Sequence, residues 1–326
     1  MIFKKGSVTL LISTMGLIAC GDSDSTTDSD VPITKIDEAV DITNSIFSKR
    51  DGDCVTYINN YESDVVDVQR SQSFAGDTEI TSTETNCILR SNNIPNHDFN
   101  DGNATFTNDV AEVSQSFTIA RNPVDAGGST PLSQRTYNGI MLNGVPIDIL
   151  SAGCYRPRSP GADANGNVAI GCNVADSWLV DPLGYGGFII DTHNAHTQPD
   201  GSYHYHGNPE AMFDDNPGPN GSPVVGFAAD GFPIYGSYFL DPNSGSVRKA
   251  LSGYTLKTGT RPIGPNNPGG AYDGTYVDDW EFTGAGDLDE CNGMTVDGQY
   301  GYYVIDDYPW IIACFTGTPN ASFNKR

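Results

Sequence analysis

Basic residues are scarce in this chain of 326 amino acids. It has 17 lysines and arginines against 41 aspartates and glutamates, which gives a formal net charge of −24 at pH 7. A surface of this charge repels nucleic acid and anionic lipid headgroups and tolerates cations. The composition therefore argues against a nucleic-acid partner and against electrostatic attachment to a membrane.

Long hydrophobic runs and familiar catalytic motifs are also lacking. The apolar stretch from Val8 to Ile18 is far shorter than the roughly 20 residues that a membrane-spanning helix needs. The chain has no C-x-x-C pair for a zinc–thiolate site, and no G-x-S-x-G, H-E-x-x-H or phosphate-loop motif. Any enzymatic activity must therefore use another set of side chains.

The N-terminus has the pattern of a bacterial lipoprotein. A positively charged start and the apolar stretch precede Leu17-Ile-Ala-Cys20, which predicts a signal peptide over residues 1–19 and a lipid on Cys20. The alternative is an ordinary secretory signal. The Asp/Ser/Thr-rich residues 20–32 are expected to form a disordered tether. Gly21, rather than aspartate, follows the cysteine and favours the outer membrane of the cell envelope.

Six cysteines remain if Cys20 carries lipid, and an even number suits an oxidising compartment. Many connectivities are possible for six cysteines, and the sequence alone does not select one. Pairing between neighbours along the chain suggests Cys54–Cys87, Cys154–Cys172 and Cys291–Cys314.

Short apolar runs rich in aromatic and β-branched residues alternate with turn residues along most of the chain. Gly187-Phe-Ile-Ile and Tyr302-Tyr-Val-Ile are examples. This pattern is typical of many short strands joined by long ordered loops. Residues 33–49 alone show helical periodicity, so we expect a short helical lead-in before a main domain over residues 50–319.

One order of motifs occurs twice. Gly139-Ile-Met-Leu-Asn-Gly-Val-Pro-Ile147 resembles Gly226-Phe-Ala-Ala-Asp-Gly-Phe-Pro-Ile234, and the segments that start at Asp200 and Asp297 also match. Because the pieces recur in the same order, we predict repeat units over about 137–209 and 225–308. The expected fold is mostly β, an irregular β-sandwich-like domain of two related lobes stapled by disulfides.

Four of the five histidines lie between residues 193 and 206. In a strand over Tyr203-His-Tyr-His206, the tyrosines point to one face and His204 and His206 to the other. The Asp-Gly turn before this strand would fold the chain back and bring His196 to the pair. Three imidazoles on rigid backbone are a common ligand set for copper or zinc.

The second repeat unit serves as an internal control for this cluster. Met294, Gly301 and Tyr303 stand where the first unit has its three histidines, whereas the flanking Asp, Asn, Thr and Tyr residues persist. The loss of all three together is expected if they serve one site. A metal-free polar pocket and purely structural histidines remain alternatives.

Three further residues are candidates to support the cluster. Asp191 and Asp200 are placed to hold imidazole N–H groups, as second-layer carboxylates do in many metal sites. His193 faces Cys291 in the alignment of the two repeat units, which suggests a scaffold or supporting position.

The segment from Ala195 to Pro209, with its Tyr-His-Tyr-His core, resembles the signature of the YHYH domain family. The resemblance extends over about residues 50–319 through motifs such as Asn93-Ile-Pro-Asn-His97 and Leu288-Asp-Glu-Cys-Asn-Gly293. The family contains bacterial exported proteins and lipoproteins without an assigned activity. The resemblance therefore implies a single domain and adds His97 as a candidate metal ligand, but it supplies no reaction.

Three functions stay open, and the sequence identifies no protein partner. The first is a cell-envelope lipoprotein that binds copper or zinc at the histidines. The second is a metal-dependent hydrolase or oxidase with the same site, which requires an open pocket and a carboxylate near the ion; Asp230 is the candidate. The third is a non-catalytic adhesion or glycan-binding module, which requires an exposed platform among the 16 tyrosines.

Overall fold

The structure of the protein is a computed structural model that describes residues 38–325. Strands, loops and three short 3-10 turns make up this range, which contains no α-helix. It follows that no helix in the described range is long and apolar enough to cross a membrane. The predicted signal peptide, the predicted lipid on Cys20 and the predicted tether all lie outside the described residues.

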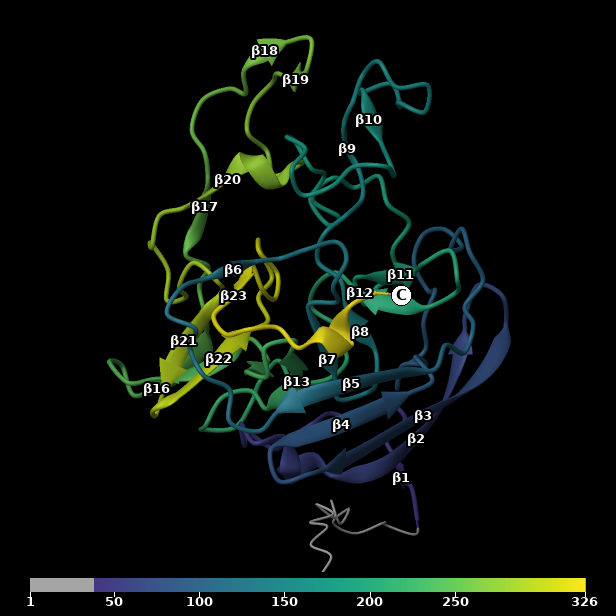
Figure 1. The fold of residues 1–326 in the computed structure, drawn as a ribbon, viewed down its shortest axis with the longest axis vertical. Coiled ribbons are helices and arrows are strands. Elements are labelled where there is room, and N and C mark those ends of the chain that lie inside the picture. The colour runs from purple at the N-terminus through teal and green to yellow at the C-terminus, as the bar shows by residue number, and fades with distance from the viewer. Residues whose placement is uncertain (1–37, 326) are drawn as a thin grey trace, which may run out of the picture. The chain divides into compact units, whose positions relative to one another are not determined.

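The first sheet has five strands and uses the N-terminal part of the described chain, coloured purple to blue in Figure 1. The strands are β1 Val40–Asp41, β2 Asn59–Asp67, β3 Gln72–Ser82, β4 Asn86–Ser91 and β5 Gln115–Ala120. They lie in chain order, so each strand pairs with its neighbour in sequence. One face is apolar, with Val65, Ile80 and Leu89 at most 2% exposed. This alternation is the predicted strand pattern.

The helix predicted over residues 33–49 is wrong for the part that the structure describes. Val40–Asp41 forms β1, which pairs in parallel with β2, and Asn44 has a φ of 52° that a right-handed helix does not allow. A short isolated helix is only marginally stable in water. The edge of β2 offers unpaired backbone groups instead, and pairing with this edge satisfies them.

The second sheet has eight strands, and its two halves have mirrored strand orders. The strands are β7 Gly139–Met141, β8 Pro146–Ile147, β11 Ala195–Thr197, β12 Tyr203–Tyr205, β13 Val224–Ala228, β14 Pro233–Tyr235, β21 Gly293–Val296 and β22 Gln299–Tyr303. Their order is β11-β12-β8-β7-β13-β14-β22-β21, so that β7 and β13 meet at the centre. Tyr205 of β12 pairs in parallel with Ile147 of β8. Tyr302 of β22 likewise pairs in parallel with Ile234 of β14.

The two sheets share one hydrophobic core. Side chains of β2 to β5 and of the central strands of the larger sheet belong to a single buried cluster. Two hydroxyls also join the sheets: Thr78 of β3 donates to the carbonyl of Asn143, and Ser91 of β4 donates to that of Gly144. The tight turn between β7 and β8 is therefore fixed against the smaller sheet.

Shorter elements surround these sheets. Five two-stranded ribbons pair β9 Cys154–Tyr155 with β10 Asn167–Val168, β15 Tyr238–Asp241 with β16 Ser246–Lys249, β17 Tyr254–Leu256 with β20 Trp280–Phe282, β18 Ile263–Gly264 with β19 Asn267–Pro268, and β6 Thr130–Pro131 with β23 Cys314–Phe315. The 3-10 turns are η1 Cys54–Tyr57, η2 Val277–Asp279 and η3 Ala321–Phe323. In Figure 1, the β9–β10 and β18–β19 ribbons lie at the end away from the five-stranded sheet.

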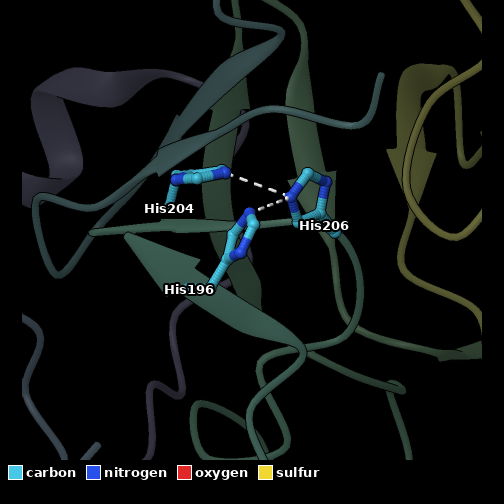
Figure 2. Close-up of side chains that lie close together, drawn as sticks. All are labelled: His196, His204 and His206. Carbon is cyan, nitrogen blue, oxygen red and sulfur yellow. Dashed lines mark hydrogen bonds between the residues drawn. The ribbon is translucent and has the colours of Figure 1, made fainter. Parts of the chain in front are cut away.

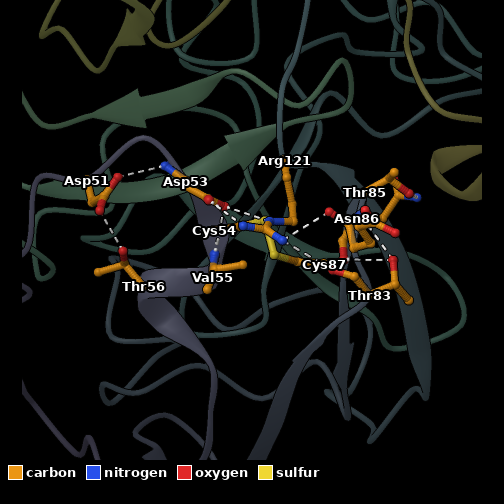
Figure 3. The surroundings of a disulfide bond; sticks show 11 residues. Asp51, Asp53, Cys54, Val55, Thr56, Thr83, Thr85, Asn86, Cys87 and Arg121 are labelled. Atoms are coloured by element: carbon orange, nitrogen blue, oxygen red, sulfur yellow. Dashed lines mark hydrogen bonds and ion pairs between the residues drawn. A yellow bond between two sulfur atoms is a disulfide. The ribbon is translucent and has the colours of Figure 1, made fainter. Parts of the chain in front are cut away.

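Six cysteines form three disulfides between neighbours along the chain: Cys54–Cys87, Cys154–Cys172 and Cys291–Cys314. The first joins η1 to β4 (Figure 3). Asp53 caps η1 by accepting from the Val55 N–H and pairs with Arg121 at 2.9 Å. Because disulfides persist in oxidising compartments, their presence suggests an extracytoplasmic protein.

Replacing Cys54 and Cys87 by alanine should lower the free energy of unfolding by about 3 to 4 kcal/mol, because a long loop regains its freedom in the unfolded chain. The two residues are 33 apart in sequence. Urea denaturation followed by circular dichroism measures the loss. Cys154→Ala/Cys172→Ala, with a separation of 18 residues, is the control and should cost somewhat less. A loss below about 1 kcal/mol in the first variant would contradict this account.

Candidate metal centre

A short hairpin of β11 and β12 carries the histidine cluster. His196 and His204 pair across the two strands. The turn between them closes through the Gly201 N–H, which donates to the carbonyl of Gln198 at 3.0 Å, and Gly201 has a φ of 86° that favours glycine. Asp200 stabilises the same turn by accepting from the N–H and hydroxyl of Ser202. The Asp-Gly pair therefore forms the predicted turn.

The three imidazoles of His196, His204 and His206 point toward one another (Figure 2). The Nε2 atom of His206 lies 3.0 Å from that of His204 and 3.0 Å from that of His196. One ligand nitrogen from each ring lies within 4.8 Å of the other two. The three rings thus surround a common small volume, and the triad could hold a metal ion.

The separations between these nitrogens suit a metal ion better than a network of hydrogen bonds. Bonds of about 2.0–2.1 Å from a tetrahedral ion place two imidazole nitrogens about 3.3 Å apart, close to the separations in the triad. A neutral ring offers either one N–H or one lone pair at Nε2. His206 Nε2 therefore cannot make two good hydrogen bonds to the other rings at once. An ion at the centre would accept a lone pair from all three.

Burial keeps the three imidazoles neutral. It lowers the pKa of His196 to about 4 and the pKa values of His204 and His206 well below the usual range, and the neighbouring imidazoles of the triad add to the effect at His204 and His206. Neutral imidazole is the form that binds metal ions. At neutral pH the three imidazoles are therefore already in the neutral form that binds a metal ion, and no proton has to leave first.

The tyrosines of β12 lie on the opposite face of the sheet, and His97 lies with them. The Nε2 atom of His97 is 2.6 Å from the hydroxyl of Tyr205, and its Nδ1 is 2.7 Å from the carbonyl of Asp98. The His97 ring packs on His193 with their centroids 3.8 Å apart. Because side chains alternate along a strand, a residue that contacts Tyr205 is across the sheet from the triad. The expected role of His97 as a ligand therefore does not fit this placement.

The other supporting residues do not contact the imidazoles of the triad as expected. The Asp191 carboxylate accepts from backbone N–H groups and from the Tyr203 hydroxyl at 2.7 Å, so it stabilises the turn before β11. The Asp200 carboxylate binds Ser202 within its own turn. His193 Nδ1 lies 2.6 Å from the Pro209 carbonyl. The Nδ1 atoms of His204 and His206 remain buried without a hydrogen-bond partner.

A cavity of about 1310 Å³ opens beside the triad. The three histidines line it together with Asp148, Gln198 and Lys325. Asp148 Oδ2 accepts from Gln198 Nε2 at 3.1 Å and pairs with Lys325. Burial raises the pKa of Asp148, and the Lys325 ammonium opposes this rise. A carboxylate thus lies near the triad without belonging to it, which is the arrangement that the hypothesis of a metal-dependent hydrolase predicts.

Sequence reasoning missed Asp148 and proposed Asp230 for this role. Asp230 accepts from the Tyr302 hydroxyl at 2.6 Å and the Gly317 N–H at 2.9 Å, and it is not among the residues that line the cavity. The repeat contained a signal for Asp148, because Tyr235 stands at its position in the second unit. Asp148 therefore resembles the three histidines, because it is present in the first repeat unit and replaced in the second.

The fold and the site define a mostly β protein with three disulfides and a buried cluster of three imidazoles. The profile of the YHYH protein family matches residues 116–317. This match covers more than half of the chain, and the chain belongs to the YHYH family, as the resemblance in sequence indicated. No curated protein and no solved structure shows significant similarity to the chain.

The metal-free protein should become less stable as the pH falls from about 7 toward 4. The imidazoles of the triad have lower pKa values in the folded state than in the unfolded chain, so protons bind preferentially to the unfolded chain below about pH 6.5. Each fully buried imidazole contributes about 1.4 kcal/mol per pH unit in that window.

Urea denaturation of chelator-treated protein at several pH values measures this slope. A His204→Gln/His206→Gln variant should have a slope that is smaller by up to about 2.7 kcal/mol per pH unit. Because both proteins share every other titrating group, the difference isolates the two imidazoles. Equal slopes would show that these rings are already charged or are exposed in the folded protein.

Proposed function

We propose that the protein binds one copper or zinc ion through His196, His204 and His206 at the bacterial cell envelope. The convergence of three Nε2 atoms on one small volume carries this proposal. Imidazole ligands suit both metals, and disulfide formation removes the six remaining cysteines as competing thiolate ligands. Three protein ligands leave a coordination position open, as in catalytic zinc sites.

Two features of the chain support an exported location. Disulfides suit an oxidising compartment, and the Leu17-Ile-Ala-Cys20 motif suits a lipoprotein whose Cys20 carries the membrane anchor. We infer an exported protein that is attached to the outer membrane only through this lipid. The negative charge of the chain would keep its surface away from anionic headgroups.

A metal-dependent enzyme is the second candidate, and the cavity beside the triad favours it. A binding protein for a metal ion alone has no need of a large adjoining chamber. The adhesion or glycan-binding candidate has less support, because each of the 16 tyrosines is buried or half-buried. An exposed aromatic platform, which that candidate requires, is therefore missing among the tyrosines.

We also infer that the larger sheet arose by internal duplication and packs on the smaller sheet as an irregular sandwich. Its mirrored strand order supports two related lobes. The register of the two hairpins also supports the related lobes. His196 pairs with His204 in the β11–β12 hairpin, and Met294 and Gly301 at the corresponding positions pair in the β21–β22 hairpin. Under this proposal the second lobe keeps the strand scaffold and lacks the metal ligands.

Protein purified without a histidine tag should contain one zinc or copper ion per chain after equilibration with the metal, because three imidazoles converge on one centre. The His204→Ala/His206→Ala variant should lose that ion. Elemental analysis of both proteins measures the stoichiometry.

His193→Gln is the matched control for the metal experiment. This histidine lies next to His97 rather than in the triad, so the variant should keep the ion. Circular dichroism checks that each variant is folded. Full metal content in the double variant would reject the site, and loss of metal in His193→Gln would show that the ligand set extends beyond the triad.

Cys20→Ser should release the protein from the membrane fraction, because the predicted lipid is the only attachment we propose. Fractionation of cells that express each protein, with radiolabelled palmitate as the tracer, measures the change. Cys154→Ser/Cys172→Ser is the control, since these residues form a disulfide and should not affect labelling. An unlabelled parent chain would point to an ordinary secretory signal.

A further inference from the structure

One buried carboxylate lies beside the triad on the same face of the larger sheet. Asp148 directly follows Ile147, the residue of β8 that pairs in parallel with Tyr205. Because side chains alternate along both strands, Asp148 points to the face that His204 and His206 share, away from the tyrosines. Asp148 is 2% exposed, and its side chain is part of the lining of the cavity.

The two oxygens of Asp148 have different surroundings. Oδ2 accepts from Gln198 and pairs with Lys325, whereas Oδ1 is buried without a hydrogen-bond partner. Gln198 connects the carboxylate to the triad, because its Nε2 lies 3.5 Å from His204 Nε2. A buried acceptor without a hydrogen bond lowers the stability of the fold. A ligand that donates a hydrogen bond to Oδ1 would therefore be favoured there.

We propose that Asp148 Oδ1 and the ion held by the triad together bind a water molecule, and that the centre hydrolyses neutral carboxylic esters that enter the cavity. This inference rests on the proposed metal site and assigns zinc to it. A divalent ion supplies Lewis acidity when bound and lowers the pKa of a water that it contacts. Asp148 is then the catalytic residue that accepts the water proton.

The atoms balance in a simple hydrolysis. The water gives a proton to Asp148 Oδ1, and its oxygen forms a bond to the carbonyl carbon of the ester. The bond from that carbon to the alcohol oxygen then breaks, and the electron pair leaves with the oxygen. The proton passes from Asp148 to the departing alkoxide, so one ester and one water become a carboxylic acid and an alcohol. No oxidant or reductant is needed.

The charge of the cavity selects against anionic substrates. Its lining carries four carboxylates and two basic side chains: Asp77, Glu79, Asp148, Asp200, Arg90 and Lys325. Arg90 is paired with Glu79, and Lys325 with Asp148, which leaves no free basic group in the lining to hold a phosphate. Tyr137, Leu150 and Phe188 add apolar surface. A neutral ester with an apolar group therefore fits this lining better than a phosphate ester.

The test compares zinc-loaded wild-type protein with Asp148→Asn, using 4-nitrophenyl acetate as the probe and 4-nitrophenyl phosphate as the anionic comparison. The wild-type protein should hydrolyse the acetate in preference to the phosphate. Asp148→Asn should lower kcat by about 100- to 10,000-fold, the usual contribution of a general base, with KM and zinc content unchanged. Acetohydroxamate, which offers a proton donor beside its zinc-binding oxygens, should bind this variant about tenfold more weakly by calorimetry.

Asp230→Asn is the matched control, because this carboxylate is also buried but does not line the cavity; it should keep kcat. If Asp148→Asn fails to fold, Gln198→Leu replaces it and should lower kcat about tenfold through loss of one hydrogen bond to Oδ2. Zinc-loaded protein without esterase activity, or an unchanged kcat in the variant at position 148 or 198, would overturn this inference alone. A chain that binds no zinc would overturn both this inference and the metal site.

Discussion

The alternation of side chains along β12 is the constraint on which the site depends. Tyr203 and Tyr205 enter the core on one face, where their hydroxyls bind Asp191 and Asn143, and these contacts fix the register of the strand. With that register fixed, His204 and the residue that follows β12, His206, must point to the other face. A slip of one residue would bury the imidazoles in the core and expose the tyrosines to the cavity. The tyrosines thus hold the imidazoles of the triad in place without touching them.

The second half of the larger sheet contains a hairpin with the same fold and no histidines. Comparison of the two hairpins shows which residues the fold needs and which belong to the candidate site. Tyr300 donates to Asp289 as Tyr203 donates to Asp191, so the same hydroxyl–carboxylate bond stabilises both hairpins. The imidazole positions have no such counterpart, because Gly301 lies where His204 would be. A hairpin of this kind therefore folds without any histidine. Folding alone gives no reason to bury three imidazoles, whose burial disfavours their charged forms and leaves nitrogen atoms unpaired.

Local sequence patterns predicted those parts of the structure that depend on interactions between residues close in sequence. The turn at Asp200-Gly201 and the facing of His204 follow from turn chemistry and strand alternation, and the structure has both. The helix at 33–49 failed because a distant strand edge offered pairing that a short helix cannot match. Long-range contacts place His97 and Asp148: His97 binds the hydroxyl of Tyr205, and Asp148 pairs with Lys325. No local pattern encodes such contacts, and for Asp148 the comparison of the two repeat units offered the only signal.

The charges around the triad determine how the positive charge of a bound ion would be compensated. Three neutral imidazoles provide ligands but no negative charge, so a divalent ion would bring two positive charges into a buried place. The nearby Asp148 is already compensated by Lys325. The long-range field of a chain with a net charge of −24 helps to draw cations in, but screening by salt limits its effect at short range. Charge balance therefore favours a fourth ligand that can become an anion, and a water that loses a proton toward Asp148 meets that need.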